Sequence, residues 1–115
     1  MQPETLFKEK VQEFLKSLPY CWTLKTNERS VRGIPDILIC LRGQFIALEL
    51  KVGENVADPL QQFYLDKIKA AGGFSLVVWP ATWHQVMPVL LKIATGQLTI
   101  RGVPEDMAVP TGAKH

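Results

Sequence analysis

Two carboxylates and a lysine stand close together in a part of the sequence that is otherwise almost entirely apolar. Asp36 lies near the start of one apolar run, and Glu49 and Lys51 lie near the end of the next. Arg42-Gly43 separates the two runs, which predicts a β-hairpin with a two-residue turn. Counting pairs outward from that turn places Asp36 directly opposite Glu49.

This register would bring all three charged side chains to one end of the hairpin. Opposed residues share a face, with Cβ atoms about 4.5–5.5 Å apart, and Lys51 projects from the same face as Glu49. Opposed acids are destabilising unless compensated, so Lys51 and a divalent cation are the expected partners. Hard oxygen ligands suit Mg²⁺ or Mn²⁺, and the carbonyl of Leu50 is a further candidate ligand. An ordinary salt bridge at a strand end is the alternative.

The chemistry expected of such a site is phosphoryl transfer to water. The ion lowers the pKa of a bound water and stabilises charge on a phosphoryl group. Lys51 would orient the nucleophile or offset the developing negative charge. Three basic residues, Lys25, Arg29 and Arg32, cluster in and beside the loop that leads into Asp36. We expect them to hold phosphates, with a solvated charged loop as the alternative.

The remaining sequence predicts the elements that position these residues. Apolar residues at helical spacing predict a helix over residues 3–18. A second helix is expected over residues 59–71, with Asp58 as its N-cap, and a third over residues 80–93. Strands are expected at residues 20–25, 34–41, 44–52 and 74–79. The hairpin strands are apolar on both faces, which favours an α/β fold whose sheet is covered on each side.

Length and composition predict one domain. The chain has 115 residues, a net charge of +2 and 47% hydrophobic residues, which excludes a polycation that coats nucleic acid by charge alone. No signal peptide or membrane-spanning run is visible, so no membrane partner is expected. Cys21 and Cys40 lack CxxC spacing and are expected as buried free thiols in a reducing compartment. These features favour a cytoplasmic protein.

The sequence Gly33-Ile34-Pro35-Asp36, followed after twelve residues by Glu49-Leu50-Lys51, resembles the signature of PD-(D/E)xK nucleases. More narrowly it is similar to the VRR-NUC group, stand-alone phage and bacterial nucleases related to Holliday-junction resolvases. The resemblance covers residues 3–79. It implies a restriction-endonuclease-like αβββαβ core, a mixed central sheet flanked by helices, with an added C-terminal helix. We expect a nuclease domain over residues 1–101 and a flexible tail over residues 102–115.

The family resemblance implies two further site residues. A glutamate of the first helix usually reaches the metal, and Glu4, Glu9 and Glu13 compete for that role. Glu4 continues the core-facing stripe of its helix and is preferred, with Glu9 second. A glutamine near the start of the second helix often lies at the active site, where Gln61 fits better than Gln62. Solvated surface residues are the alternative for both positions.

The sequence therefore predicts a Mg²⁺- or Mn²⁺-dependent DNA endonuclease in the cytoplasm of a bacterium or a phage-infected host. No helix-turn-helix or zinc signature is visible, which favours recognition of DNA shape, such as a branch, flap, nick or four-way junction. Resemblance and small size imply a homodimer. The alternatives are a non-catalytic nucleic-acid-binding or interaction module that retains the fold, and a nuclease that acts on RNA.

Overall fold

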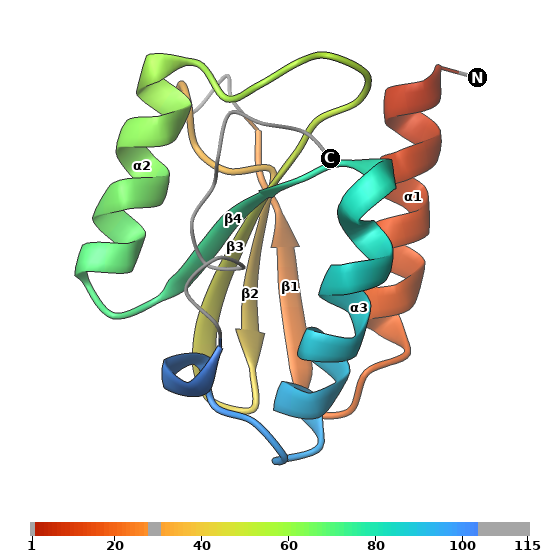
Figure 1. Ribbon diagram of the computed structural model, residues 1–115, viewed down its shortest axis with the longest axis vertical. Helices are drawn as coiled ribbons and strands as arrows, with labels where there is room; N and C mark the ends of the chain where they lie inside the picture. The colour runs from red at the N-terminus through yellow and green to blue at the C-terminus, as the bar shows by residue number, and fades with distance from the viewer. Residues whose placement is uncertain (1, 28–30, 104–115) are drawn as a thin grey trace.

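A four-stranded mixed sheet forms the centre of the molecule (Figure 1). The computed structural model describes residues 2–27 and 31–103 of the chain. The strands lie in the order β1 (Cys21–Lys25), β2 (Ile37–Leu41), β3 (Gln44–Leu50) and β4 (Phe74–Val78). Strand β2 is antiparallel to both β1 and β3, and β3 and β4 are parallel. The predicted α/β class and the predicted order of helices and strands are confirmed.

The β2–β3 hairpin has the register that the sequence predicts. Its pairs run from Leu41 opposite Gln44 to Ile37 opposite Leu48. Arg42 and Gly43 form the turn with φ angles of +48° and +80°. Positive φ at both central residues is what the common two-residue hairpin turn requires.

Helices cover the sheet from both sides (Figure 1). Helices α1 (Pro3–Lys16) and α3 (Pro80–Ala94) pack on one face, and α2 (Pro59–Ala70) packs on the other. The main core lies between the sheet and the first pair of helices. There the rings of Phe7 and Phe14 meet Trp83 edge-on, with centroids 6.4 and 5.4 Å apart. Such edge-to-face contacts add to the free energy gained by burying the rings.

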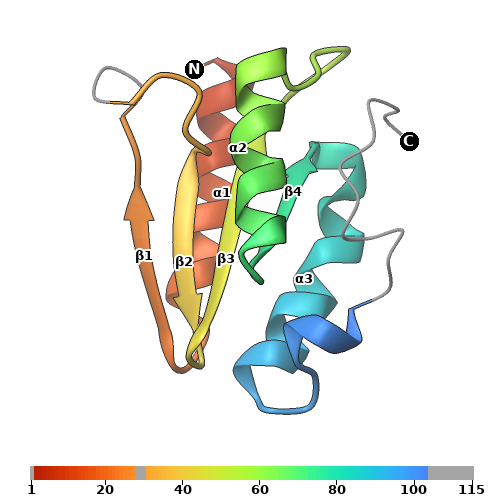
Figure 2. The same cartoon turned by 90° about the vertical axis from the view of Figure 1, so that its left-hand side faces the viewer.

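The prediction that both faces of the hairpin strands are covered is wrong for β2. Helix α2 lies over β3 and β4 and leaves β1 and β2 open on its side of the sheet (Figure 2). Burial therefore alternates along β2, where Ile39 is buried and Cys40 is exposed. The predicted burial of both thiols is wrong for Cys40, whereas Cys21 is half-buried.

The C-terminal part of the described chain folds back onto the sheet. A 3₁₀ helix, η1 (Ile100–Gly102), is attached to β3 because the Ile100 N–H donates to Gln44 Oε1 at 2.7 Å. Val103 is buried against the main core. Residues 104–115 of the predicted tail lie outside the described residues. Within residues 2–27 and 31–103, no helix has the length and hydropathy needed to cross a membrane.

Candidate active site

The predicted catalytic acids lie at one end of the β2–β3 hairpin. Asp36 directly precedes β2, and Glu49 is the second-last residue of β3. Asp36 Oδ2 accepts a hydrogen bond from the Leu50 N–H at 2.7 Å, so its carboxylate is fixed against the neighbouring strand. The backbone carbonyl of Asp36 accepts from the N–H and the hydroxyl of Thr26, at 2.9 and 3.1 Å. Asp36 is therefore anchored both to the end of β1 and to the end of β3.

Glu49 is a buried carboxylate with a lysine beside it. Its residue is 3% exposed, and no other charged residue among those that the structure describes is buried. Lys51 Nζ lies 3.5 Å from Glu49 Oε2. The Lys51 N–H donates to the Val78 carbonyl at 3.0 Å, which extends the β3–β4 pairing and fixes the lysine backbone. Burying the charge of Glu49 costs free energy, and the ion pair with Lys51 offsets that cost only in part. Buried charges of this kind concentrate at functional sites.

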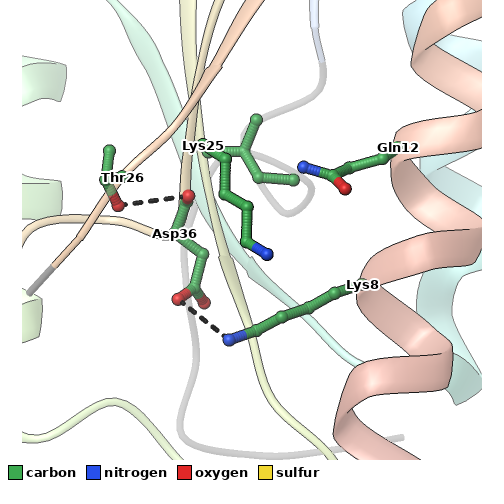
Figure 3. Close-up of a pocket in the computed structure, with 6 residues that line it drawn as sticks. Lys8, Gln12, Lys25, Thr26 and Asp36 are labelled. Atoms are coloured by element: carbon green, nitrogen blue, oxygen red, sulfur yellow. Dashed lines mark hydrogen bonds and ion pairs between the residues drawn. The ribbon is translucent and has the colours of Figure 1, made fainter.

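Lys8 of α1 lies beside the acidic residues, although nothing in the sequence around it predicts this position. Its Nζ lies 3.2 Å from Glu4 Oε2 and 3.7 Å from Asp36 Oδ1. Figure 3 shows Lys8 reaching from α1 toward Asp36. Burial lowers the pKa of Lys8, but the charge of Asp36, then Glu4 and Glu49, outweighs burial, so the pKa is raised. The only sequence signal for this role is the spacing of four residues between Glu4 and Lys8.

The three candidate glutamates of α1 differ in their surroundings. We call Asp36 and Glu49 the acid cluster. Glu4 is connected to Asp36 of this cluster through Lys8. Glu9 and Glu13 line a separate groove on α1, together with Leu6 and Lys10. Of the three, Glu4 is the one that the structure brings to the site.

The structure describes two of the three predicted phosphate-binding residues, Lys25 and Arg32. Lys25 lines a cavity of about 20 Å³ with Lys8, Gln12, Thr26 and Asp36 (Figure 3). That volume holds about one water molecule or one atom of similar size. Its lining includes two ammonium groups and one carboxylate, which suits an anionic oxygen. Elsewhere, Arg32 is exposed in the turn that leads to Asp36, and Arg29 lies outside the described residues.

Gln61 has a structural role at the start of α2. The Gln61 N–H donates to Asp58 Oδ1 at 2.8 Å, and Gln61 Oε1 accepts from the Asp58 N–H at 3.0 Å. This reciprocal pair is a capping box, and it confirms Asp58 as the N-cap. The side-chain oxygen of Gln61, the residue predicted near the active site, thus accepts a hydrogen bond within the cap.

The Gln61→Ala variant is expected to lower the free energy of unfolding by about 1 kcal/mol, since the Asp58 N–H loses its partner. Gln61→Glu should retain most of the stability, because glutamate serves equally well at this position of a capping box. Chemical denaturation of both variants measures this difference. Equal loss of stability in the two variants would contradict the capping role.

Gly33 lies three residues before Asp36, at a point where the chain packs closely against α2. Its φ is +85°, and a Cβ at this position would lie 2.6 Å from Leu60 Cγ on α2. Gly33→Ala is therefore expected to cost about 3 kcal/mol of unfolding free energy, from backbone strain and overpacking together. Gly53→Ala is the matched control, because Gly53 has a φ of +60° but a Cβ there would meet nothing within 4 Å. We expect that control to cost about 1 kcal/mol in the same urea titration; equal costs would contradict the contact with Leu60.

The donor atoms at this site fit a magnesium-type ion. Asp36 and Glu49 supply two hard carboxylates, and Leu50 lies between Glu49 and Lys51 in the chain. Among the residues that the structure describes, no three His, Cys, Asp or Glu side chains converge as a ready-made metal cage. Mg²⁺ is commonly held by only one or two carboxylates, with waters and substrate phosphates as its other ligands. The two acids therefore suit an ion that is completed by substrate.

Comparisons with known proteins identify no relative. No protein-family model matches the chain, and neither the curated proteins nor the solved structures contain a significant match. The resemblance to PD-(D/E)xK nucleases therefore stays a prediction that rests on the motif residues and their spacing.

Proposed function

We propose that this protein is a metal-dependent endonuclease that hydrolyses DNA phosphodiester bonds on a restriction-endonuclease-like core of the VRR-NUC type. The observation that carries the proposal is the buried Glu49 of β3 with Lys51 beside it. The carboxylate of Asp36 is hydrogen-bonded to the same strand, at Leu50. This is the arrangement expected of an aspartate and a Glu-x-Lys motif that share one active site.

Each charged side chain then has a distinct role. Asp36 and Glu49 would hold Mg²⁺ or Mn²⁺, with the Leu50 carbonyl as a further ligand. When bound, the ion supplies Lewis-acid stabilisation of the phosphoryl group and a water of lowered pKa. The contact of Lys51 with Glu49 supports a role for its ammonium group in orienting a water or offsetting negative charge.

The lysines beside Asp36 support binding of the scissile phosphate. Lys8 and Lys25 both line the small cavity next to the Asp36 carboxylate. Two ammonium groups can donate hydrogen bonds to phosphate oxygens without reading the base sequence. Glu4 keeps Lys8 in place from the adjacent turn of α1.

The preferred substrate is proposed to be branched, flap or four-way-junction DNA. The net charge of +2 leaves little long-range attraction for a plain duplex, so binding must depend on local contacts. Lys25 and Arg32, with Arg29 in the same loop of the sequence, would supply such contacts near the acids. Contacts to phosphates position DNA and favour shape over sequence.

The test is a cleavage assay with end-labelled duplex, nicked, flap and four-way-junction DNA and a flap-shaped RNA. Each substrate is incubated with Mg²⁺, Mn²⁺ or EDTA. We expect cleavage of branched DNA with either metal ion and none with EDTA. Absence of metal-dependent cleavage on every substrate would contradict the proposal. Binding without cleavage would instead favour the non-catalytic module, and cleavage of RNA alone would favour the ribonuclease.

A further inference from the structure

The part of the sheet that α2 leaves uncovered carries an open surface beside the acid cluster (Figure 2). Trp22, Cys40 and Phe45 lie opposite one another on three adjacent strands, so they form one row on this face. Leu24 and Leu38 form the next row, closer to the acid cluster. We call these five residues the sheet patch. Four of them are exposed and Leu38 is half-buried, so the sheet patch is open to solvent.

The sheet patch lies on the same face of the sheet as Glu49. Alternate residues of a strand point to one face, so Phe45 and Glu49 of β3 share it. These two residues are four positions apart, which is about 13 Å along the strand. A nucleic-acid strand with a phosphate about every 3.4 Å spans that distance with about four nucleotides. Nucleotides next to a phosphate at the acid cluster can therefore reach the sheet patch.

Two exposed aromatic side chains stand at the sides of the sheet patch. Trp22 is 61% exposed and Phe45 is 45% exposed. Strand β2 separates them by about 10 Å, and the side chain between them is the small thiol of Cys40. Unpaired bases stack on aromatic side chains irrespective of their sequence, because every base has a flat π-face. The row thus provides two stacking positions for unpaired bases.

Basic residues border the sheet patch, and none of its own residues carries a charge. Leu60 of α2 lies against Gly33, in the segment that leads into β2, so this side of the helix is turned toward the open strands. Lys67 follows Leu60 by two helical turns and therefore lies on the same side. At the end nearest the acid cluster, Lys25 ends β1 and Arg32 is exposed in the turn before β2. Cations around an uncharged surface suit a strand whose bases face the protein and whose phosphates lie at the rim.

We propose that the sheet patch is a subsite for unpaired nucleotides, whose bases stack on Trp22 and Phe45. The inference rests on the proposed nuclease function and narrows its substrate to DNA with at least about four unpaired nucleotides beside the cleaved bond. A fully paired arm offers no free base to stack on protein, so a flap is favoured over a four-way junction. Bases are favoured over a partner protein here, because a protein on this face would obstruct the approach of DNA to the acid cluster.

Binding of single-stranded DNA tests the subsite independently of cleavage. The probe is a thymidine oligonucleotide about 12 nucleotides long, titrated in EDTA so that divalent ions are absent. Trp22 is the exposed tryptophan, whereas Trp79 and Trp83 are 5% and 4% exposed, so quenching of the intrinsic fluorescence reports on the sheet patch. We expect the oligonucleotide to quench this fluorescence. An abasic oligonucleotide of the same length and charge should bind at least about 10-fold more weakly, because it has no bases to stack.

Substitutions in the row give the matched test. Fluorescence anisotropy of the labelled thymidine oligonucleotide measures the affinity of every variant. Trp22→Ala and Phe45→Ala should each weaken binding by about 10-fold, whereas Trp22→Phe keeps an aromatic ring and should retain most of the affinity. Tyr20→Ala is the control, because Tyr20 is 71% exposed but lies before β1, away from the acid cluster and with Arg42 over its ring. It should leave the affinity unchanged, and thermal melts verify that all variants fold.

Equal affinity for the two oligonucleotides, or wild-type affinity of Trp22→Ala for the thymidine oligonucleotide, would overturn the inference and favour a partner protein on the sheet patch. Cleavage in Mg²⁺ separates this result from the proposed function. Below saturation, the wild type should cut flap DNA about 10-fold faster than Trp22→Ala, and equal rates would contradict the subsite alone. No cleavage by the wild type, together with base-dependent quenching, would contradict the nuclease function alone.

Discussion

Replacing Asp36 with asparagine is expected to reduce Mg²⁺-dependent DNA cleavage by a factor of about 10³ or more. Asparagine retains the shape of the side chain and an oxygen that can accept the Leu50 N–H, so the backbone anchor survives. It loses the negative charge that would hold the ion and that now faces Lys8 at 3.7 Å. Single-turnover cleavage of the preferred branched substrate measures the effect, and a thermal melt checks that the fold is retained.

The matched control for Asp36 is Asp66→Asn on α2. Asp66 is exposed and accepts a hydrogen bond from Gln62 Nε2 at 2.9 Å, away from the acid cluster. Its replacement removes the same charge from the chain but is expected to leave cleavage unchanged. Cleavage by Asp36→Asn at the wild-type rate would contradict the role of Asp36. A comparable loss in Asp66→Asn would show that overall charge, and not the site, sets the rate.

The second large effect is expected for Lys51→Met, which should lower the rate of cleavage by about 10²–10³-fold. Methionine matches the length of the lysine stem but removes the ammonium group that lies 3.5 Å from Glu49. Because Lys51 is proposed to act on the water or the developing charge, binding of Mn²⁺ should persist. Mn²⁺ titration followed by electron paramagnetic resonance, together with single-turnover cleavage, separates these two properties.

Lys92→Met is the control for this substitution, since Lys92 is exposed in the last turn of α3. It should match the wild type in both Mn²⁺ binding and cleavage. Loss of Mn²⁺ binding by Lys51→Met in parallel with cleavage would contradict the proposed role. In that case Lys51 would act by holding Glu49 in position.

The hairpin and its end were predictable because local signals agree there. The two apolar runs and the short Arg42-Gly43 turn between them predict the register that the hairpin adopts. The start of α2 was equally predictable from the sequence, because Asp58 followed by proline is a strong N-cap signal. These local features are sufficient to bring Asp36 and Glu49 to the same end of the sheet.

Two features depend on distances between elements and were not visible in the sequence. In the sequence, Lys8 is indistinguishable from a solvated helix lysine, and only the packing of α1 against the start of β2 places it beside Asp36. The apolar residues of β2 indicated burial on both faces, but periodicity does not report how many strands a helix covers. Helix α2 covers β3 and β4, so Cys40 stays exposed. Both differences arise from tertiary placement and not from a wrong assignment of helix or strand.

The central claim is that Asp36 and Glu49 share one divalent ion, and a crystal soaked in Mn²⁺ tests it most directly. An anomalous difference map should show a peak with a carboxylate oxygen of each residue about 2.1 Å away. The peak should be absent from crystals of Asp36→Asn soaked in the same way. A fully soaked wild-type crystal with no peak between the two carboxylates, or with a peak only elsewhere, would contradict the proposed metal site.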